Sequence, residues 1–275
     1  MTKSSGVAAE QRLVEVLKSE VKEANHSNQL EATVLPISSA VQSGTLSVPF
    51  ALSAALQTTS ELVWRGKEIE DFVYRQLVRK LEFTPPENIS APDIAIAGPV
   101  LEALRYTRHR HLICELYLNL LASALDIKSA KTVHPGYVDI IKNMTSDEVR
   151  IIAHLLEVKV IPVIDINKVR SGNLGDIKIN TLVSTIGVDA GCEYEELSES
   201  YLNNLERIGL IEIPKDTYIT DPGVYDRILT SLPVKAKIHI LNRGKDQFRA
   251  GINKYFAKLT LFGRYFGQTC VIGHS

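Results

Sequence analysis

The apolar residues of this chain change their spacing near residue 158, and that change limits the folds open to it. Before that point they recur at helical intervals and line one side of each segment. From Val158 to Val169 the chain is instead rich in Val and Ile, which favours a strand, and Pro162 within it is typical of an edge strand. The pattern therefore predicts an α+β protein that is mainly α-helical.

Helical spacing predicts several helices in the first half of the chain. They are Val7–Ala24, Glu61–Phe83, Ala97–Tyr106, Leu112–Leu125 and Pro135–Lys142. Another helix is expected after Thr145, because Thr145 and Ser146 precede two acidic residues, Asp147 and Glu148, in the pattern of a capped helix start.

The second half mixes helices and strands. A helix is expected over Tyr194–Ile208, where Gly209 would end it, followed by a strand over Leu210–Ile213 and a short helix over Pro222–Leu232. Val234–Leu241 alternates Lys with apolar residues and predicts a half-exposed strand, paired with Ile252–Leu259 across a loop at Asn242–Gly251. Thr260 is expected to cap a final helix beginning at Leu261.

These elements predict an N-terminal helical domain followed by a winged-helix-like α/β C-terminal domain. We place N-terminal helices in residues 1–83, a helical core in residues 84–144, and the winged-helix-like domain with a basic C-terminal hairpin in residues 145–275.

Charge is distributed unevenly along the chain. Val234–Ser275 holds eight Lys or Arg residues and one acid, Asp246, whereas the preceding residues hold 23 basic and 31 acidic side chains. Such an asymmetry indicates where an anionic partner would bind. The candidate nucleic-acid-binding residues are Lys235, Lys237, Arg243, Lys245, Arg249, Lys254 and Lys258.

DNA or RNA is therefore a candidate partner of the basic hairpin, because clustered cations suit phosphate contacts. The preceding helix argues against base reading, since its Glu193, Glu195, Glu196 and Glu199 would repel phosphates. The alternative is a solvated basic hairpin that balances the acidic remainder within the fold or within a dimer.

Residues 32–60 contain no charged side chain, and Pro36, Gly44 and Pro49 interrupt them. The best apolar window, Leu46–Leu56, has 11 residues, whereas a spanning helix needs about 20. We expect closely packed helices of a soluble protein. Insertion of this segment into a membrane is the alternative.

The sequence predicts no enzyme, cofactor or metal. It lacks the phosphate-loop, nucleophile-elbow and zinc-protease motifs. His109, His111 and Cys114 do not share one helix face, His134 before Pro135 suits a turn, and Asp165 is a lone acid. The three cysteines suit reduced thiols, and a start without an apolar signal run predicts a cytoplasmic protein.

Two sequence runs carry a family likeness. The first is IAGPVLEALRY at Ile96–Tyr106, continued by LNLLASALD at Leu118–Asp126, and the second is VHPGYVDIIK at Val133–Lys142. With two less specific runs, Leu205–Ile211 and Leu259–Phe266, they resemble the abortive infection alpha (Abi-alpha) family over roughly residues 61–270. Where acidic residues usually follow the Arg-Tyr pair, this chain has Thr107–His111.

The resemblance implies antiviral defence by abortive infection and brings no active site. We therefore expect a non-enzymatic defence protein that acts by binding. Its partner would be an unknown protein, a second copy of itself, or nucleic acid through the basic C-terminal region. The alternative is a membrane-acting toxin that inserts residues 32–60 on infection.

Overall fold

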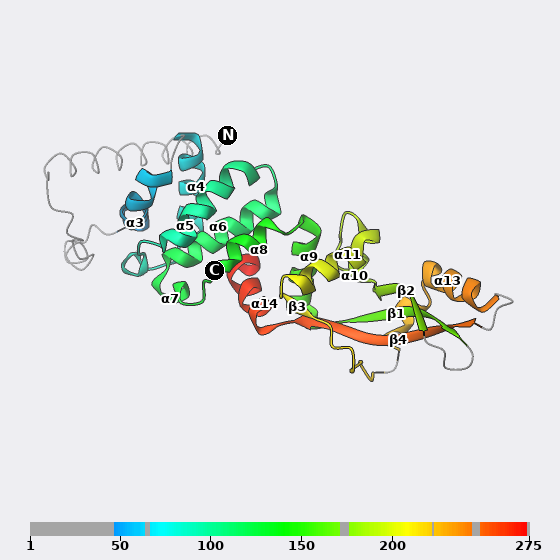
Figure 1. Cartoon of the computed structure of the whole chain (residues 1–275). Coiled ribbons are helices and arrows are strands. Elements are labelled where there is room, and N and C mark those ends of the chain that lie inside the picture. Colours follow the sequence, from blue (N-terminus) through cyan, green and yellow to red (C-terminus); the bar gives the residue numbers. More distant parts are fainter. Residues whose placement is uncertain (1–46, 64–66, 171–175, 222, 244–247, 274–275) are drawn as a thin grey trace, which may run out of the picture.

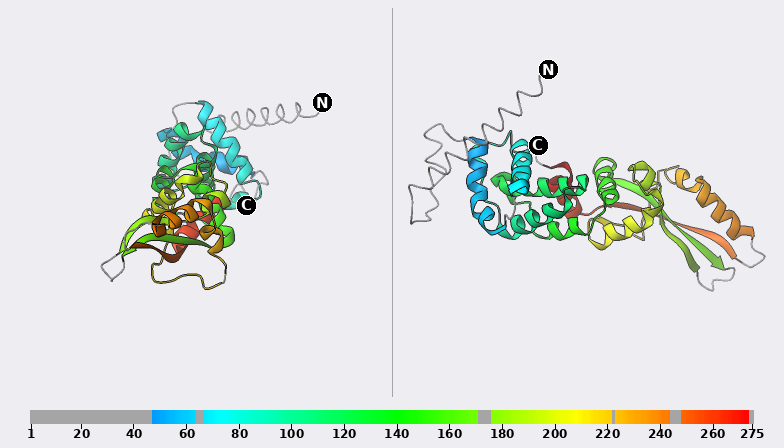
Figure 2. Two further views of the ribbon diagram at one scale, coloured as in Figure 1. Left: turned by 90° about the vertical axis from the view of Figure 1, so that its right-hand side faces the viewer. Right: turned by 90° about the horizontal axis from the view of Figure 1, so that it is seen from above.

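A computed structural model describes residues 47–63, 67–170, 176–221, 223–243 and 248–273. These residues form a helical body from which a long β arm extends (Figure 1; right-hand view of Figure 2). The fold is α+β and mainly α-helical, as predicted. The expected helix Val7–Ala24 lies outside the described residues.

Most of the described chain is helical, and its strands lie in the second half. The helices are α3 (Val48–Val63), α4 (Lys67–Lys80), η1 (Pro86–Asn88), α5 (Ile94–Thr107), α6 (His111–Leu125), α7 (Ile127–Ala130), α8 (Gly136–Lys142), α9 (Ser146–Val158), α10 (Ile186–Asp189), η2 (Glu195–Leu197), α11 (Ser198–Arg207), α12 (Asp226–Leu229), α13 (Leu232–Arg243), α14 (Leu261–Phe266) and the π-helix η3 (Gly267–Ile272). The strands are β1 (Val160–Arg170), β2 (Asp176–Val183), β3 (Ile211–Glu212) and β4 (Phe248–Leu259).

Helix α6 lies at the centre of the body. From Ile113 to Leu125 every residue except Glu115 is buried, so other elements surround the helix on all sides. Helices α4, α5, α8 and α9 pack around it. The end of the chain returns to the same helix, where Asn119 Nδ2 donates to the Cys270 carbonyl at 2.8 Å. One large core thus joins α5, α6 and α8 to the C-terminal helices.

The described strands form an antiparallel sheet in the order β2-β1-β4-β3. The prediction of β1 as an edge strand is wrong, because β1 lies between β2 and β4. Pro162 fits there because β2 pairs with β1 only from Ile164 onward, so that no strand adjoins Pro162 on its β2 side. Proline is tolerated in a strand that has no neighbour on one side, and β1 meets this condition at the Pro162 end but not along its whole length.

A second, smaller core holds the outer half of the arm together. Ile164 and Ile166 of β1 pack there against Ile228 of α12 and Val234 of α13. Tyr225 joins the same cluster, and its hydroxyl donates to the Tyr255 carbonyl of β4 at 2.7 Å. This cluster fixes α13 near the far end of the sheet, away from the helical body (Figures 1 and 2).

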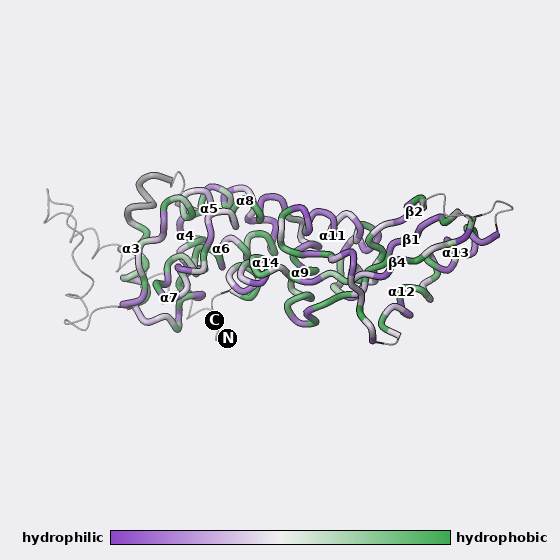
Figure 3. The backbone as a smooth tube through the Cα atoms, turned by 60° about the horizontal axis from the view of Figure 1, so that its bottom comes forward, coloured by the Kyte–Doolittle hydropathy of each residue, from purple (hydrophilic) through white to green (hydrophobic). Residues whose placement is uncertain are grey.

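The prediction of a basic hairpin is wrong. Residues 234–241 lie within helix α13, and β4 pairs with β1 and β3 instead. Hydrophobic and hydrophilic residues alternate closely along α13 (Figure 3), but Val234, Ile238 and Leu241 also have helical spacing and pack on the smaller core. Pro233 lies in the first turn, where its missing N–H has no helical partner to lose.

The uncharged segment is described from residue 47, and residues 32–46 lie outside the described part. Ala51, Leu52, Ala55 and Leu56 of α3 are buried in the large core. In the part of the chain that the structure describes, no helix has both the length and the apolar character needed to cross a membrane.

The predicted cap at Thr145 is confirmed. Its hydroxyl accepts from the Glu148 N–H at 3.3 Å, and the Glu148 carboxylate accepts from the Thr145 N–H at 2.6 Å. We expect Thr145→Ala to lower the free energy of unfolding by about 1 kcal/mol, because a helix donor loses its partner. Urea titration checks this against Ser200→Ala, an exposed position in α11 that we expect to stay within about 0.5 kcal/mol of wild type. Equal losses in both variants would contradict a specific role for the cap.

Candidate functional site

The structure divides the predicted nucleic-acid-binding residues between two elements. Lys235, Lys237 and Arg243 lie on α13. Arg249, Lys254 and Lys258 lie on β4. Lys245 lies outside the described residues. The six described cations do not form one surface, because β4 directs alternate side chains to opposite sides of the sheet.

The β4 cations are separated from one another. Ile252 and Lys254 lie on the side of the sheet that carries α13, and Lys254 Nζ lies 5.1 Å from the ring centre of Tyr225. Alternation places Arg249 on the opposite side. Lys258 lies nearer the helical body, where its Nζ is 3.0 Å from the Glu212 carboxylate. Lys258 has the same parity as Lys254 and so shares its side of the sheet, but it is paired at the β3 end of the strand rather than beside α13.

The outward side of α13, which we call the α13 face, combines exposed apolar and basic groups. Leu232 is 85% exposed and Ile240 is 68% exposed, with exposed Ala236 between them at helical spacing. Lys235 and Arg243 are exposed beside them, and α13 contains no acidic residue. Large apolar groups exposed beside cations on one side of a helix make the α13 face a candidate interaction surface.

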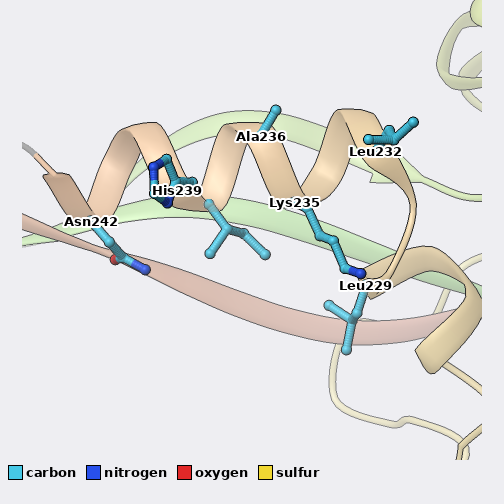
Figure 4. Close-up of a pocket in the computed structure, with 7 residues that line it drawn as sticks. Leu229, Leu232, Lys235, Ala236, His239 and Asn242 are labelled. Carbon is cyan, nitrogen blue, oxygen red and sulfur yellow. The ribbon is translucent and has the colours of Figure 1, made fainter.

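A shallow depression runs along one flank of the α13 face (Figure 4). Its lining combines Leu229 of α12 with Leu232, Lys235, Ala236, Ile238, His239 and Asn242 of α13. Figure 4 shows Lys235 reaching toward Leu229 along the helix. Asn242 helps to hold the end of the helix, because its Oδ1 accepts from the Ala250 N–H of β4 at 2.9 Å. The lining thus combines apolar side chains with the Lys235 ammonium group and the polar side chains of His239 and Asn242.

Sequence reasoning missed the apolar part of this face. Leu232, Ala236 and Ile240 follow one another at intervals of four residues, which is a helical signal. The signal was hidden because the alternation of Lys with apolar residues also fits a strand.

The residues considered for catalysis have structural partners. His134 Nδ1 accepts from the Gly136 N–H at 3.0 Å, so His134 closes a turn. Asp165 is fully buried, its Oδ1 accepts from the Leu182 N–H at 2.9 Å, and its Oδ2 lies 3.4 Å from Lys178 Nζ. Asp165 thus ties β2 to β1, at the irregular part of their pairing.

The cysteines are free and buried, as the sequence indicated. Burial raises the pKa of Cys114 and of Cys192 to about 11, and that of Cys270 well above its ordinary value. These groups therefore stay protonated thiols at neutral pH. Among the described residues, no three His, Cys, Asp or Glu side chains gather in a group able to hold a metal ion.

The fold and the α13 face together define a mainly helical α+β protein that presents a basic helix near the end of a β arm. The chain belongs to the abortive infection alpha family, whose profile matches residues 65–270. The resemblance noted in its sequence motifs is thereby confirmed.

Other comparisons add little. No curated protein matches the chain significantly. A solved structure of an uncharacterized protein from the hydrocarbon-degrading marine bacterium Alcanivorax borkumensis is 17% identical, with a TM-score of 0.36. That alignment covers 52% of this chain and 96% of the other. At this TM-score the likeness does not define a shared fold.

Proposed function

We propose that the protein serves abortive infection without a catalytic step, by binding an acidic partner through the α13 face. The observation that carries this proposal is the exposure of Leu232 and Ile240, at 85% and 68%, beside Lys235 and Arg243 on a helix without acids. Apolar side chains supply affinity when a partner buries them, and the cations select an acidic partner. Membership of the abortive infection alpha family is the reason for linking this binding to defence by abortive infection.

The placement of α13 suits a binding role. Val234 is buried in the smaller core and Ile238 packs against it, so the helix is held from one side only. A helix held in this way binds without a large loss of conformational freedom. Its position on the arm leaves the outward side accessible to a large partner (Figure 2).

Nucleic acid is the second candidate partner. It is favoured by the six described cations of α13 and β4, because neither element contains an acidic residue. The scattered placement of the β4 cations and the exposed Leu232 and Ile240 favour a protein surface instead. Phosphate contacts do not require exposed aliphatic groups.

Phage plating tests the proposal. We expect the triple variant Lys235→Gln, Lys237→Gln and Arg243→Gln to lose protection, because losing three cations weakens binding to an acidic partner by on the order of tenfold or more. The matched control removes three exposed body cations through Lys128→Gln, Lys131→Gln and Lys142→Gln, and we expect it to protect like wild type. Full protection by the α13 variant at equal protein level would contradict the proposal.

A pair of apolar substitutions separates the two partner classes. We expect Leu232→Ser with Ile240→Ser to abolish protection, while any salt-sensitive retention of the protein on DNA or RNA stays unchanged. If this variant protects fully and the triple lysine and arginine variant neither protects nor binds nucleic acid, nucleic acid becomes the better candidate.

A further inference from the structure

A second exposed surface of the molecule has the opposite charge to the α13 face. We call residues Glu193–Glu199 the acidic segment. Glu193, Glu195 and Glu196 are exposed there, and two apolar residues of the same segment, Tyr194 and Leu197, are 52% and 44% exposed. Carboxylates surrounding exposed apolar groups are the chemical complement of the α13 face.

The acidic segment is held rigidly by the protein. The buried carboxylate of Asp147 accepts from the Glu193 N–H at 2.8 Å and from the Tyr194 N–H at 3.0 Å. At the other end, Thr181 of β2 donates to the Glu199 carboxylate at 2.5 Å. Because hydrogen bonds hold both ends of the segment, binding costs mainly the freedom of its exposed side chains.

We propose that the α13 face of one copy of this chain docks on the acidic segment of a second copy. This inference rests on the proposed function and names the acidic partner in it. Leu232 and Ile240 would be covered by Tyr194 and Leu197, while Lys235 and Arg243 would meet the glutamates. Burial of apolar groups supplies affinity, and opposite charges set the register.

Like charge disfavours the other pairings between copies. Two α13 faces would bring cations together, and two acidic segments would bring carboxylates together. Each contact therefore joins different surfaces of the two copies, which either closes into a pair with two such contacts or extends into a chain.

The contact is small, because it involves the outer side of a 12-residue helix and a short segment. Interfaces of this size are at the low end of specific ones. We therefore expect a dissociation constant on the order of 10 µM or weaker, with association that decreases as salt is raised.

A charge-swap experiment on the full chain tests the inference by sedimentation velocity. One variant carries Lys235→Glu with Arg243→Glu, and the other carries Glu195→Lys with Glu196→Lys. We expect wild type to associate with rising concentration and each variant alone to remain monomeric. An equimolar mixture of the two variants should associate again, because each reversed surface then meets a complementary one.

The control Lys128→Glu with Lys131→Glu reverses two exposed cations of the body, and we expect it to associate like wild type. A mixture that stays monomeric, or wild type that stays monomeric throughout the concentration series, would overturn the inference. Salt-sensitive retention of wild type on nucleic acid, combined with a monomeric mixture, would assign the α13 face to nucleic acid instead.

Phage plating separates this inference from the proposed function. Protection lost by each variant alone and regained when both are co-expressed supports both. Protection lost only by the α13 variant, with no association by wild type, overturns the second copy as partner and leaves the proposed function standing. Protection by the α13 variant at a normal protein level overturns the proposed function itself.

Discussion

Replacing Asp147 with alanine is expected to lower the free energy of unfolding by about 3–5 kcal/mol. Asp147 is only 3% exposed, and its carboxylate accepts from the N–H groups of Glu193 and Tyr194 and from the Tyr201 hydroxyl at 3.0 Å. Arg150 forms an ion pair with it. The substitution leaves the buried Tyr201 hydroxyl and the part-buried N–H groups without their acceptor, and it also releases the start of the acidic segment.

The effect of Asp147→Ala should depend on pH. Burial alone raises the pKa of Asp147, but the hydrogen bonds from Glu193, Tyr194, Tyr201 and Arg150 outweigh it and hold the pKa below its usual value. A lowered folded-state pKa stabilises the fold above the unfolded-state value, which is about 3.9. This contribution is lost as the pH falls from there through the folded-state pKa, so wild type and variant should converge in acid.

Urea titrations between neutral pH and about pH 3 measure both effects. The control is Asp139→Ala, because the Asp139 side chain is 80% exposed and its contact with Lys142 is 3.6 Å long. Exposed ion pairs contribute little, and we expect a change within about 1 kcal/mol. Similar losses for both variants would contradict the structural role assigned to Asp147.

A Gly→Ala substitution is expected to change the stability of the protein in opposite directions at two helical positions. At Gly263 in α14, a Cβ atom would lie 1.9 Å from the Leu210 carbonyl oxygen and 2.8 Å from its carbon. That oxygen also accepts from the Thr260 N–H at 3.0 Å, so it cannot move without breaking a contact. We expect Gly263→Ala to destabilise the protein by about 3 kcal/mol.

At Gly98 in α5, a Cβ atom would meet nothing within 4 Å. Alanine has the higher helix propensity, and we expect Gly98→Ala to stabilise the protein by up to about 1 kcal/mol. Thermal unfolding of the two variants beside wild type measures both changes in stability in one experiment. A Gly263→Ala protein as stable as Gly98→Ala would show that α14 does not approach Leu210, the residue before β3, this closely.

Signals that act over a few residues were read correctly from the sequence. The cap at Thr145 forms, the Thr260 hydroxyl accepts from the Gly263 N–H at 2.8 Å, and Gly209 ends α11 with a φ of +77°. Each of these depends on backbone geometry within one turn, which the local sequence controls.

Interactions between distant residues could not be read in this way. The pattern over residues 234–241 fits both a strand and a helix, and the choice depends on where Ile164 and Ile228 lie. The central position of β1 likewise depends on pairing with β4, which begins 78 residues after β1 ends. Such pairings are decided by packing rather than by propensity.

The sequence by itself determined the family, the helix caps, the excess of cations after residue 233 and the acids of Glu193–Glu199. Only the tertiary structure decided which of these charges share a surface with exposed apolar groups. The physical reason is packing: once one side of a helix or strand is buried against other elements, the residues on its opposite side are the ones exposed. Because Val234 of α13 packs into the smaller core, Leu232 and Ile240 lie on the outward side with Lys235 and Arg243.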